Sequence, residues 1–327
     1  MIDRSQALVT VIGGGGFIGR YVCEALLRAG VRVRVAQRNP RQAYFIQPLA
    51  AVGQLSFVAA DLERPRAMAR AVEGAQAVIN LVGILKGRFD AMHVEGARTA
   101  AAAAREGGAT AFVQISAIGA DPGSPSAYGR SKANGEAAVR VVFPSATVIR
   151  PSLVFGPEDQ LTNRFASMAR LPLLPVIAPN TRFQPIYVRD LARAIADAAL
   201  DPARHGGVIY ELGGPEVMTM RALNERVATL AGQSPNLIDV PDFAAGLMAK
   251  FGFLPGAPIT RDQWAMLQRD NVVAPGAAGL DAFGIAPTPL AAVAGEWLGR
   301  YREGGRFAPL RPLAHPAPLA PQDRPAV

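Results

Sequence analysis

The chain has almost none of the residues that build disulfide scaffolds or metal sites. Cys23 is the only cysteine among 327 residues, which rules out an intrachain disulfide and fits a reducing compartment. The histidines His93, His205 and His315 are scattered, and they show no metal-ligand spacing with that cysteine. We therefore expect no disulfide framework and no metal.

Long hydrophobic runs are missing as well. Gly, Pro or Arg interrupts every apolar stretch before it reaches the roughly 18 residues that span a bilayer. The N-terminus enters a strand pattern at once and lacks the apolar core and cleavage site of a secretory signal, so we expect no export and a cytoplasmic location. Half of the residues are hydrophobic and 18% are charged, which is typical of a globular protein with a sizeable core.

Lysine is scarce although the net charge is +8. Only Lys86, Lys132 and Lys250 are lysines, so 31 of the 34 basic residues are arginines. Together with abundant Ala, Gly and Pro, this bias is typical of a GC-rich genome, and the alternative is a basic face that docks on an anionic membrane or an acidic partner. No dense basic run contains interleaved aromatics, so we do not expect a nucleic-acid partner.

Hydrophobic runs alternate with helical patterns through the first 150 residues. Strands are expected at Leu8–Ile12, Val31–Ala36, Leu55–Ala59, Ala75–Val82, Ala111–Ser116 and Thr147–Arg150. Helices are expected at Phe17–Arg28, Arg66–Val72, Met92–Arg105 and Tyr128–Val142. Because right-handed crossovers cover both faces of a parallel sheet, this order predicts an α/β fold with a Rossmann-type doubly wound parallel sheet.

The rhythm changes after residue 150, where Pro and Gly become frequent. Helical patterns recur at Asn163–Arg170, Asp190–Leu200, Met220–Ala231 and Ala291–Tyr301, with strand-like pieces at Gln184–Val188 and Val208–Leu212. We predict a nucleotide-binding domain over residues 5–150 and a smaller C-terminal lobe over 151–302, interleaved with the last strands. A Pro/Arg-rich tail at 303–327 is expected to be disordered. The apolar stretch Phe243–Leu254 is expected to pack in the core, with contact to a membrane or a partner as the alternative.

A glycine-rich loop follows the first strand and opens the first helix. Gly13, Gly16 and Gly19 have the GxxGxxG spacing, followed in the helix by Phe17 and Ile18. The first two glycines allow a tight turn and close approach of backbone N–H groups to a pyrophosphate, and the third lets the helix pack on the strand. With the positive end of the helix, this loop predicts a dinucleotide site.

The end of the second strand indicates which dinucleotide is bound. Binders of a ribose 2′-hydroxyl usually carry an acidic residue there, about 20 residues after the glycines. Residues 35–41 contain no acid but include Arg38 and Arg41. A guanidinium pairs with a 2′-phosphate, whereas a carboxylate would repel it, so the sequence favours NADPH over NADH.

The ends of the later strands complete the expected site, because parallel strands present their carboxyl ends along one edge of the sheet. The residues are Asp61 and Leu62 for the adenine, Asn80 and Val82 for the ribose and nicotinamide, and Arg150 with Pro151 for closing the nicotinamide pocket.

Tyr128 and Lys132 form a YxxxK motif, and at this spacing on a helix both side chains project from one face. A nearby ammonium favours the phenolate, so we expect a lowered pKa for Tyr128 and proton exchange near neutrality. Together with the glycine loop, the motif resembles the short-chain dehydrogenase/reductase superfamily, extended type, over residues 7–235. The resemblance implies that Tyr128 donates or accepts a proton and that Lys132 binds the nicotinamide ribose.

The superfamily also holds the substrate oxygen with a Ser or Thr just after the fifth strand. Ser116 is the only hydroxyl in that stretch, and the usual position falls one or two residues later, on Ala117 or Ile118. Ser116 is therefore the candidate third catalytic residue, and the alternative is that Tyr128 and Lys132 only hold the cofactor.

A narrower resemblance is carried by SAIGAD at 116–121, SAYGRSKANGE at 126–136, RPSLVFGPED at 150–159, NRFA at 163–166 and FQPIYVRD at 183–190. Together these segments resemble the NADPH-binding accessory subunits of respiratory complex I (NADH:ubiquinone oxidoreductase) and their bacterial relatives. The resemblance implies a nucleotide held as structure, complex I subunits as partners, and a position near the ubiquinone site and the membrane. For a bacterial chain this would be the cytoplasmic face of the inner membrane.

Three functions follow from these observations. The first is an accessory subunit that holds NADPH with little or no turnover. The second is an NADP-dependent oxidoreductase or epimerase/dehydratase that acts on a small-molecule substrate through Tyr128 and Lys132. The third is a redox sensor that binds NADP(H) and reports its oxidation state to a partner.

Overall fold

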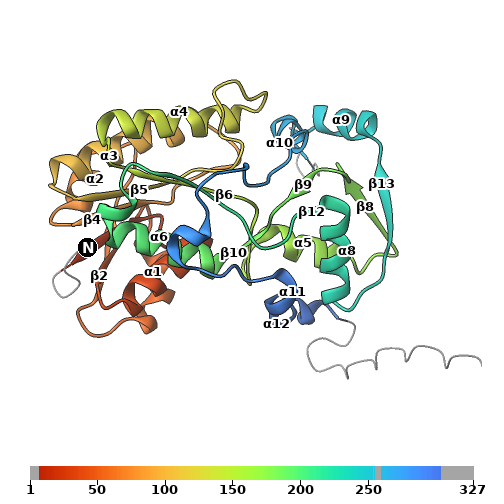
Figure 1. Cartoon of the computed structure of the whole chain (residues 1–327), viewed down its shortest axis with the longest axis horizontal. Coiled ribbons are helices and arrows are strands. Elements are labelled where there is room, and N and C mark those ends of the chain that lie inside the picture. The colour runs from red at the N-terminus through yellow and green to blue at the C-terminus, as the bar shows by residue number, and fades with distance from the viewer. Residues whose placement is uncertain (1–6, 253, 255–258, 303–327) are drawn as a thin grey trace, which may run out of the picture.

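The computed structural model describes residues 7–252, 254 and 259–302. Figure 1 shows the predicted nucleotide-binding domain, which is built around one large sheet, and beside it a smaller lobe formed by most of the later residues. The predicted disorder of the tail at 303–327 lies outside the described residues.

The central sheet has seven parallel strands in the order β11-β6-β5-β4-β1-β2-β3. Their bounds are β1 Leu8–Ile12, β2 Arg32–Gln37, β3 Leu55–Ala59, β4 Ala77–Asn80, β5 Ala111–Ile115, β6 Thr147–Pro151 and β11 Ile209–Leu212. The chain runs outward from β1 to β3 and then crosses to β4 on the other side of β1. This reversal opens a crevice at the carboxyl edge, and it confirms the doubly wound fold.

Both faces of the sheet are covered by helices, which explains why β1, β4 and β5 are buried along their whole length. Helices α2 Pro65–Val72, α3 Gly96–Glu106 and α4 Ala127–Val142 cover one face, and α1 Phe17–Arg28 with α6 Val188–Leu200 covers the other (Figure 1). Five buried alanines of α3 let it lie close to the sheet, namely Ala97, Ala100, Ala101, Ala103 and Ala104.

The C-terminal lobe combines short helices with two-stranded sheets. Its helices are α5 Gln160–Met168, α8 Met220–Leu230, α9 Asp242–Lys250, α10 Arg261–Leu267, α11 Leu290–Val293 and α12 Gly295–Leu298. Its strands are β7 Val154–Phe155, β8 Leu173–Ile177, β9 Arg182–Phe183, β10 Ile186–Tyr187, β12 Met218–Thr219 and β13 Asn236–Val240. Helix α6 and strand β11 return to the nucleotide-binding domain, so the lobe is interleaved with the last strand of the main sheet.

Several elements differ from the predictions. The segment Asp90–Glu95 is a π-helix that precedes α3, where the sequence predicts one continuous α-helix from Met92. The predicted final helix is divided into α11, α12 and the short 3-10 turn Gly299–Tyr301. The chain also contains the 3-10 segment Pro40–Leu49, the 3-10 turn Leu280–Phe283 and the short helix α7 Pro202–His205, which carry no clear periodic signal.

Helix α9 corrects the expectation that the apolar stretch Phe243–Leu254 packs in the core, for the residues that the structure describes; Phe253 lies outside them. Ala245 and Ala249 are buried, but Phe243 on the opposite side is 80% exposed and Leu247 is 54% exposed. No helix among the described residues is long and apolar enough to cross a membrane. Within the same residues no cluster of His, Cys, Asp or Glu is arranged to hold a metal ion.

Candidate functional site

A cavity of about 650 Å³ opens at the carboxyl edge of the sheet, beside the point where the strand order reverses. Its position between the ends of β1, β2 and β4 is where doubly wound folds bind nucleotides. Six of the residues predicted from the sequence to hold the cofactor line it: Gly13, Gly16, Arg38, Asp61, Leu62 and Val82.

The glycine loop forms the floor of this cavity. Gly13 has φ +82°, a left-handed conformation that side chains disfavour, and its carbonyl accepts a hydrogen bond from the Gly16 N–H. A Cβ atom on Gly19 would lie 2.5 Å from the Gly13 carbonyl oxygen, so only glycine lets α1 begin this close to the loop. Phe17 and Ile18, the first two residues of α1, pack against the core and are not among the cavity-lining residues.

Gln37 stands at the end of β2, near the position where 2′-hydroxyl binders carry an acid. Its side-chain oxygen accepts a hydrogen bond of 2.9 Å from the Gly15 N–H, and its amide nitrogen donates to the Asn39 carbonyl. A neutral amide thus braces the glycine loop in this chain. Arg38 lines the cavity beside it, and its exposed guanidinium has no partner within the described part of the chain.

The ends of β3 and β4 form the opposite wall. Asp61 and Leu62 line the cavity, and the Asp61 carboxylate accepts a hydrogen bond from the Glu63 N–H. Asn80 is buried and holds the strand ends in place: its amide nitrogen donates to Gln114, and its oxygen accepts from the Val82 N–H. Val82 lines the cavity and Asn80 does not, so Asn80 fixes the position of the Val82 backbone from the buried side of the strand end.

Tyr128 and Lys132 lie one turn apart near the start of α4. The Lys132 Nζ atom lies 5.8 Å from the centre of the Tyr128 ring and donates a hydrogen bond to the Ile115 carbonyl. The same atom lies 3.3 Å from the place where a Cβ on Gly83 would stand, and Gly83 lines the cavity. Lys132 therefore lies against the cavity wall at Gly83, on the side expected for the nicotinamide ribose, but neither Tyr128 nor Lys132 is among the residues that line the cavity.

Burial dominates the electrostatics of this pair and corrects one expectation. It raises the pKa of Tyr128 to about 12, whereas the sequence led us to expect a lowered value. Burial also lowers the pKa of Lys132 to about 8, although the nearby Glu136 carboxylate opposes this shift. Burial thus disfavours both the tyrosinate and the ammonium: Tyr128 is neutral near neutral pH, whereas Lys132 keeps its proton up to about pH 8.

Ser116 occupies the residue after β5. Its side chain is 4% exposed, and its hydroxyl oxygen has no hydrogen-bond partner among the described atoms. Buried hydroxyl groups in folded proteins nearly always have a hydrogen-bond partner, so a buried hydroxyl without one is a candidate ligand contact. The glycine loop, which a single Cβ would obstruct, fits a bound dinucleotide, whereas Ser116 is not among the residues that line the cavity. Ala117 and Ile118, where the substrate-holding hydroxyl is expected, offer no side-chain donor.

Comparison with known proteins places this geometry in a family. Residues 9–213 match the family described as "NAD dependent epimerase/dehydratase family". The chain belongs to this family. The family match supports a nicotinamide cofactor, and the resemblance to extended short-chain dehydrogenases is confirmed.

Two relatives extend the match beyond the sheet. The chain is 33% identical, over 92% of its own length and 79% of the relative's, to "NADH dehydrogenase [ubiquinone] 1 alpha subcomplex subunit 9, mitochondrial" of Arabidopsis thaliana. It is 34% identical to a "Ceramide reductase" of Caulobacter vibrioides, over 74% of this chain and 76% of that one.

A solved structure shares the fold at low identity. The NADPH-dependent quinone oxidoreductase QOR2 of Escherichia coli, in complex with NADPH, superimposes with a TM-score of 0.70 at 19% identity, covering 88% of this chain and 99% of that one. This match concerns the family's fold and leaves open what the present chain binds or converts.

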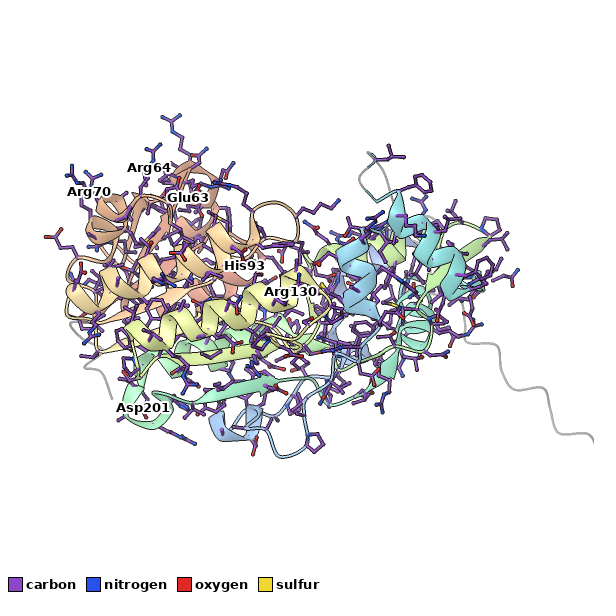
Figure 2. The ribbon with its side chains drawn as sticks, turned by 90° about the horizontal axis from the view of Figure 1, so that it is seen from above. Glu63, Arg64, Arg70, His93, Arg130 and Asp201 are labelled. Carbon is purple, nitrogen blue, oxygen red and sulfur yellow. The ribbon has the colours of Figure 1, made fainter. Side chains whose placement is uncertain are left out.

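His93 is a site residue that sequence analysis missed. Figure 2 shows it inside the nucleotide-binding domain, whereas Arg64 and Arg70 project from the edge. Its Nε2 atom accepts a 3.0 Å hydrogen bond from the Ile84 N–H, and its ring contacts Tyr128 edge-on, with the ring centres 5.5 Å apart. The nearest sequence signal is a lone histidine 35 residues before the YxxxK tyrosine, so only the fold brings them together.

Arg150 is placed differently from what the sequence suggests for this family's nicotinamide pocket. Its guanidinium makes a two-pronged ion pair with Glu136, at 2.9 and 2.6 Å, and reaches Glu211 at 3.4 Å. Arg150 and Pro151 are both outside the set of cavity-lining residues. The arginine joins α4 to strands β6 and β11, and its role toward the cofactor stays a prediction.

Proposed function

We propose that this chain is an accessory subunit of, or a factor associated with, respiratory NADH:ubiquinone oxidoreductase, in which the nucleotide is held as structure. The observation that carries the proposal is the site after β5: the glycine loop and Arg38 line a cavity at the carboxyl edge, but Ala117 and Ile118 stand where a substrate-holding hydroxyl is expected. Relatives named as complex I subunits, across most of the chain, support the same assignment.

NADPH is the proposed nucleotide. Arg38 lines the cavity with a free guanidinium beside the end of β2, and Gln37 replaces an acid with a neutral amide. A 2′-phosphate at this point would gain a charge-assisted hydrogen bond and meet no carboxylate at the end of β2. The neighbouring Asn39 and Gln42 side chains also line this end of the cavity and add neutral polar groups.

The C-terminal lobe supports a position at the membrane surface of the complex. Phe243 and Leu247 on α9 are exposed, as are Leu173 on β8 and Ile238 on β13. A surface that carries several exposed apolar side chains is typical of a contact with a partner or with lipid. We propose that this lobe faces the inner membrane at the complex, on its cytoplasmic side in a bacterial cell.

The first experiment purifies the protein without added nucleotide, denatures it and identifies the molecules released. Stoichiometric NADPH that survives gel filtration supports the proposal, and an empty protein that binds NADPH weakly and reversibly contradicts it. Gly13→Ala should abolish retention, while Gly53→Ala serves as the matched control. Gly53 also has φ +78°, but nothing lies within 4 Å of its added Cβ.

Association is tested separately by gentle extraction of membranes from the native host. The proposal expects the chain to co-purify with the NADH:ubiquinone oxidoreductase, and its absence from that complex would count against the proposal. The Gly13→Ala variant connects the two experiments: a structural nucleotide predicts that the empty variant assembles poorly.

A second candidate function is an NADP-dependent reductase on a small carbonyl substrate. The specific observation that favours it is the YxxxK pair, whose lysine reaches the cavity wall at Gly83. Tyr128 would then donate its hydroxyl proton to the carbonyl oxygen of the substrate. Tyr128→Phe should abolish turnover and leave nucleotide binding nearly unchanged, and an unchanged rate in this variant contradicts the candidate.

A further inference from the structure

A carboxylate from the C-terminal lobe sits at the start of the helix that carries the YxxxK pair. Asp262, on α10, accepts hydrogen bonds from the Ala127 N–H at 2.6 Å and the Tyr128 N–H at 3.2 Å. The Oδ2 atom, which accepts from Tyr128, also accepts a 3.0 Å hydrogen bond from the hydroxyl of the buried Ser126. The residue that completes the first turn of α4 is therefore 134 positions away from Tyr128 in the sequence.

This contact suits the physics of a helix N-terminus. The first N–H groups of a helix lack partners within it, and the helix dipole favours negative charge there. Ser126 provides the ordinary cap, because its hydroxyl oxygen accepts a hydrogen bond from the Gly129 N–H. Asp262 accepts hydrogen bonds from the two preceding N–H groups of the helix, those of Ala127 and Tyr128. Because Tyr128 itself donates one of these bonds, the backbone that carries its ring is held by the other lobe.

Asp262 is held firmly on its own side. Thr260 and Gln263 form a reciprocal capping box at the start of α10, with hydrogen bonds of 3.0 and 3.2 Å. Helix α10 packs against α9: the Trp264 Nε1 atom lies 3.6 Å from the place where a Cβ on Gly246 would stand. The helix that carries the Asp262 carboxylate is thus in direct contact with the helix that exposes Phe243.

Two further residues strengthen the connection between the lobes. Asn271 accepts hydrogen bonds from the Ser152 hydroxyl and the Leu153 N–H, and it donates to the Ile118 carbonyl. Arg269 forms a 3.0 Å ion pair with Asp121. The segment 260–274 therefore spans the loops after β5 and β6 as well as the start of α4, along the carboxyl edge that holds the nucleotide cavity.

We propose that Asp262 is a positioning residue that couples the nucleotide site to the exposed face of α9. The proposal rests on the proposed function only in assuming that the nucleotide contacts Lys132 or Tyr128. A nucleotide that restricts the motion of α4 also restricts the Ala127 and Tyr128 N–H groups that bind Asp262. Because Asp262 lies on α10 and α10 packs against α9, the motion of α9 is then restricted as well. The coupling is reciprocal, so a partner bound at α9 strengthens nucleotide binding.

Hydrogen–deuterium exchange on the full chain tests the coupling. Without nucleotide, Asp262→Asn should make the amides of Ala127 and Tyr128 exchange about tenfold faster, the size expected for losing a charged cap. With NADPH, the wild-type chain should show slower exchange both in the glycine loop and in α9. In Asp262→Asn the glycine loop should still be protected, and the added protection of α9 should be lost.

Glu216→Gln is the matched control, because Glu216 pairs with Arg226 in the same lobe at 3.5 Å and both are exposed. It should leave every exchange rate near the wild-type value. Asp262→Glu keeps the charge and should restore part of the α9 response, a rescue that a merely structural role would not require. Circular dichroism and the thermal midpoint verify that each variant is folded.

The two proposals fail in different ways. If NADPH does not bind, the nucleotide arm fails with the proposed function, but the nucleotide-free arm still tests the contact of Asp262 with α4. If NADPH binds and protects the glycine loop without slowing exchange in α9, the coupling is wrong and the proposed function stands. Protection of α9 that persists in Asp262→Asn also overturns the coupling.

Discussion

The Nδ1 atom of His93 lies 2.8 Å from the hydroxyl oxygen of Ser131, on the turn of α4 between Tyr128 and Lys132. The Ser131 hydroxyl donates to the Tyr128 carbonyl, so it accepts from His93, and the imidazole proton stands on Nδ1. The other ring nitrogen then accepts from the Ile84 N–H, which lines the nucleotide cavity. A neutral histidine thus joins the cavity wall to the YxxxK helix, and burial lowers the pKa of His93 to about 3.

This arrangement predicts a loss of stability in acid. The unfolded chain protonates His93 near pH 6.5, but the folded chain resists protonation down to about pH 3, so the free energy of unfolding falls as the pH drops through this range. His93→Phe should remove that contribution and lower stability at neutral pH by about 1–3 kcal/mol, because the Ile84 N–H loses its partner. Urea unfolding between pH 7.5 and 4 measures both effects.

Ser131→Ala is the companion variant for this prediction. It keeps the imidazole and removes only the hydroxyl that His93 contacts. Its pH dependence should resemble that of the wild-type chain. An identical acid slope in His93→Phe and in the wild-type chain would show that His93 does not cause the effect.

Lys132 predicts that nucleotide affinity depends on pH in the alkaline range, above the acid range in which His93 acts. Its pKa of about 8 means that the ammonium is lost as the pH rises above 8, and with it the strongest donor at the Gly83 wall. Affinity for NADPH should therefore fall between pH 7 and 9.5. Lys132→Met should bind about tenfold more weakly at pH 7 and show little further loss at pH 9.5. Titration by the fluorescence of NADPH measures the affinities.

Lys132 also contributes to stability, with the sign reversed from the binding effect. The unfolded chain keeps its proton up to about pH 10.5, whereas the folded chain releases it near pH 8. The unfolded state binds more protons in this window, so the free energy of unfolding of the nucleotide-free chain should rise with pH there. A slope that is the same in Lys132→Met would contradict the assignment.

Arg38 predicts the preference between the two dinucleotides. Arg38→Asp replaces the free guanidinium with a carboxylate at the end of β2. NADPH affinity should fall about 10- to 100-fold, as expected for losing a hydrogen bond to a charged group, while NADH affinity should hold or improve. Arg28→Asp is the control, since Arg28 is exposed at the far end of α1. Equal losses for both nucleotides would show that Arg38 does not contact the 2′-phosphate.

The parts of this structure that the sequence predicted depend on local signals. The glycine loop is recognisable in the sequence because the φ of +82° at Gly13 requires a glycine. Strand β1 is recognisable because its full burial requires a continuous run of mostly apolar residues. The same holds for Tyr128 and Lys132, whose spacing on one helix is readable without any tertiary structure. The doubly wound sheet follows from the alternation of such segments.

The contacts that the sequence did not reveal are those between distant segments. His93 meets Ser131 because a Cβ on Gly135 would lie 2.1 Å from the His93 carbonyl oxygen, so α4 can approach the π-helix only at a glycine. Asp262 meets Tyr128 through the packing of two lobes. Neither a lone histidine nor a lone aspartate has a periodic signal, and the shift in the pKa of Tyr128 depends on burial that only the fold creates.

The exposed face of α9 predicts binding to lipid. Replacing Phe243 and Leu247 with Ser should reduce co-sedimentation with vesicles that contain anionic phospholipid, because both side chains would leave water on contact. Val141→Ser is the control, since Val141 is equally exposed, at 80%, on the nucleotide-binding domain. If the double variant binds vesicles as well as the control does, α9 faces a protein and not lipid.

Arg150 separates two roles that the sequence and the structure assign to it. As a cofactor ligand it would be needed for NADPH binding, but the structure commits its guanidinium to Glu136 and Glu211. Arg150→Met should then cost about 3 kcal/mol of stability, because it leaves the buried Glu136 carboxylate without its partner. Arg150→Met combined with Glu136→Met should regain much of that loss, since the unpaired charge is gone. NADPH affinity, measured at a temperature where the variant is folded, should change little in Arg150→Met; the double variant is used for stability alone, because it also removes the Glu136 carboxylate that raises the pKa of Lys132. A large loss of affinity in Arg150→Met with little loss of stability would show that the arginine leaves Glu136 to bind the nucleotide.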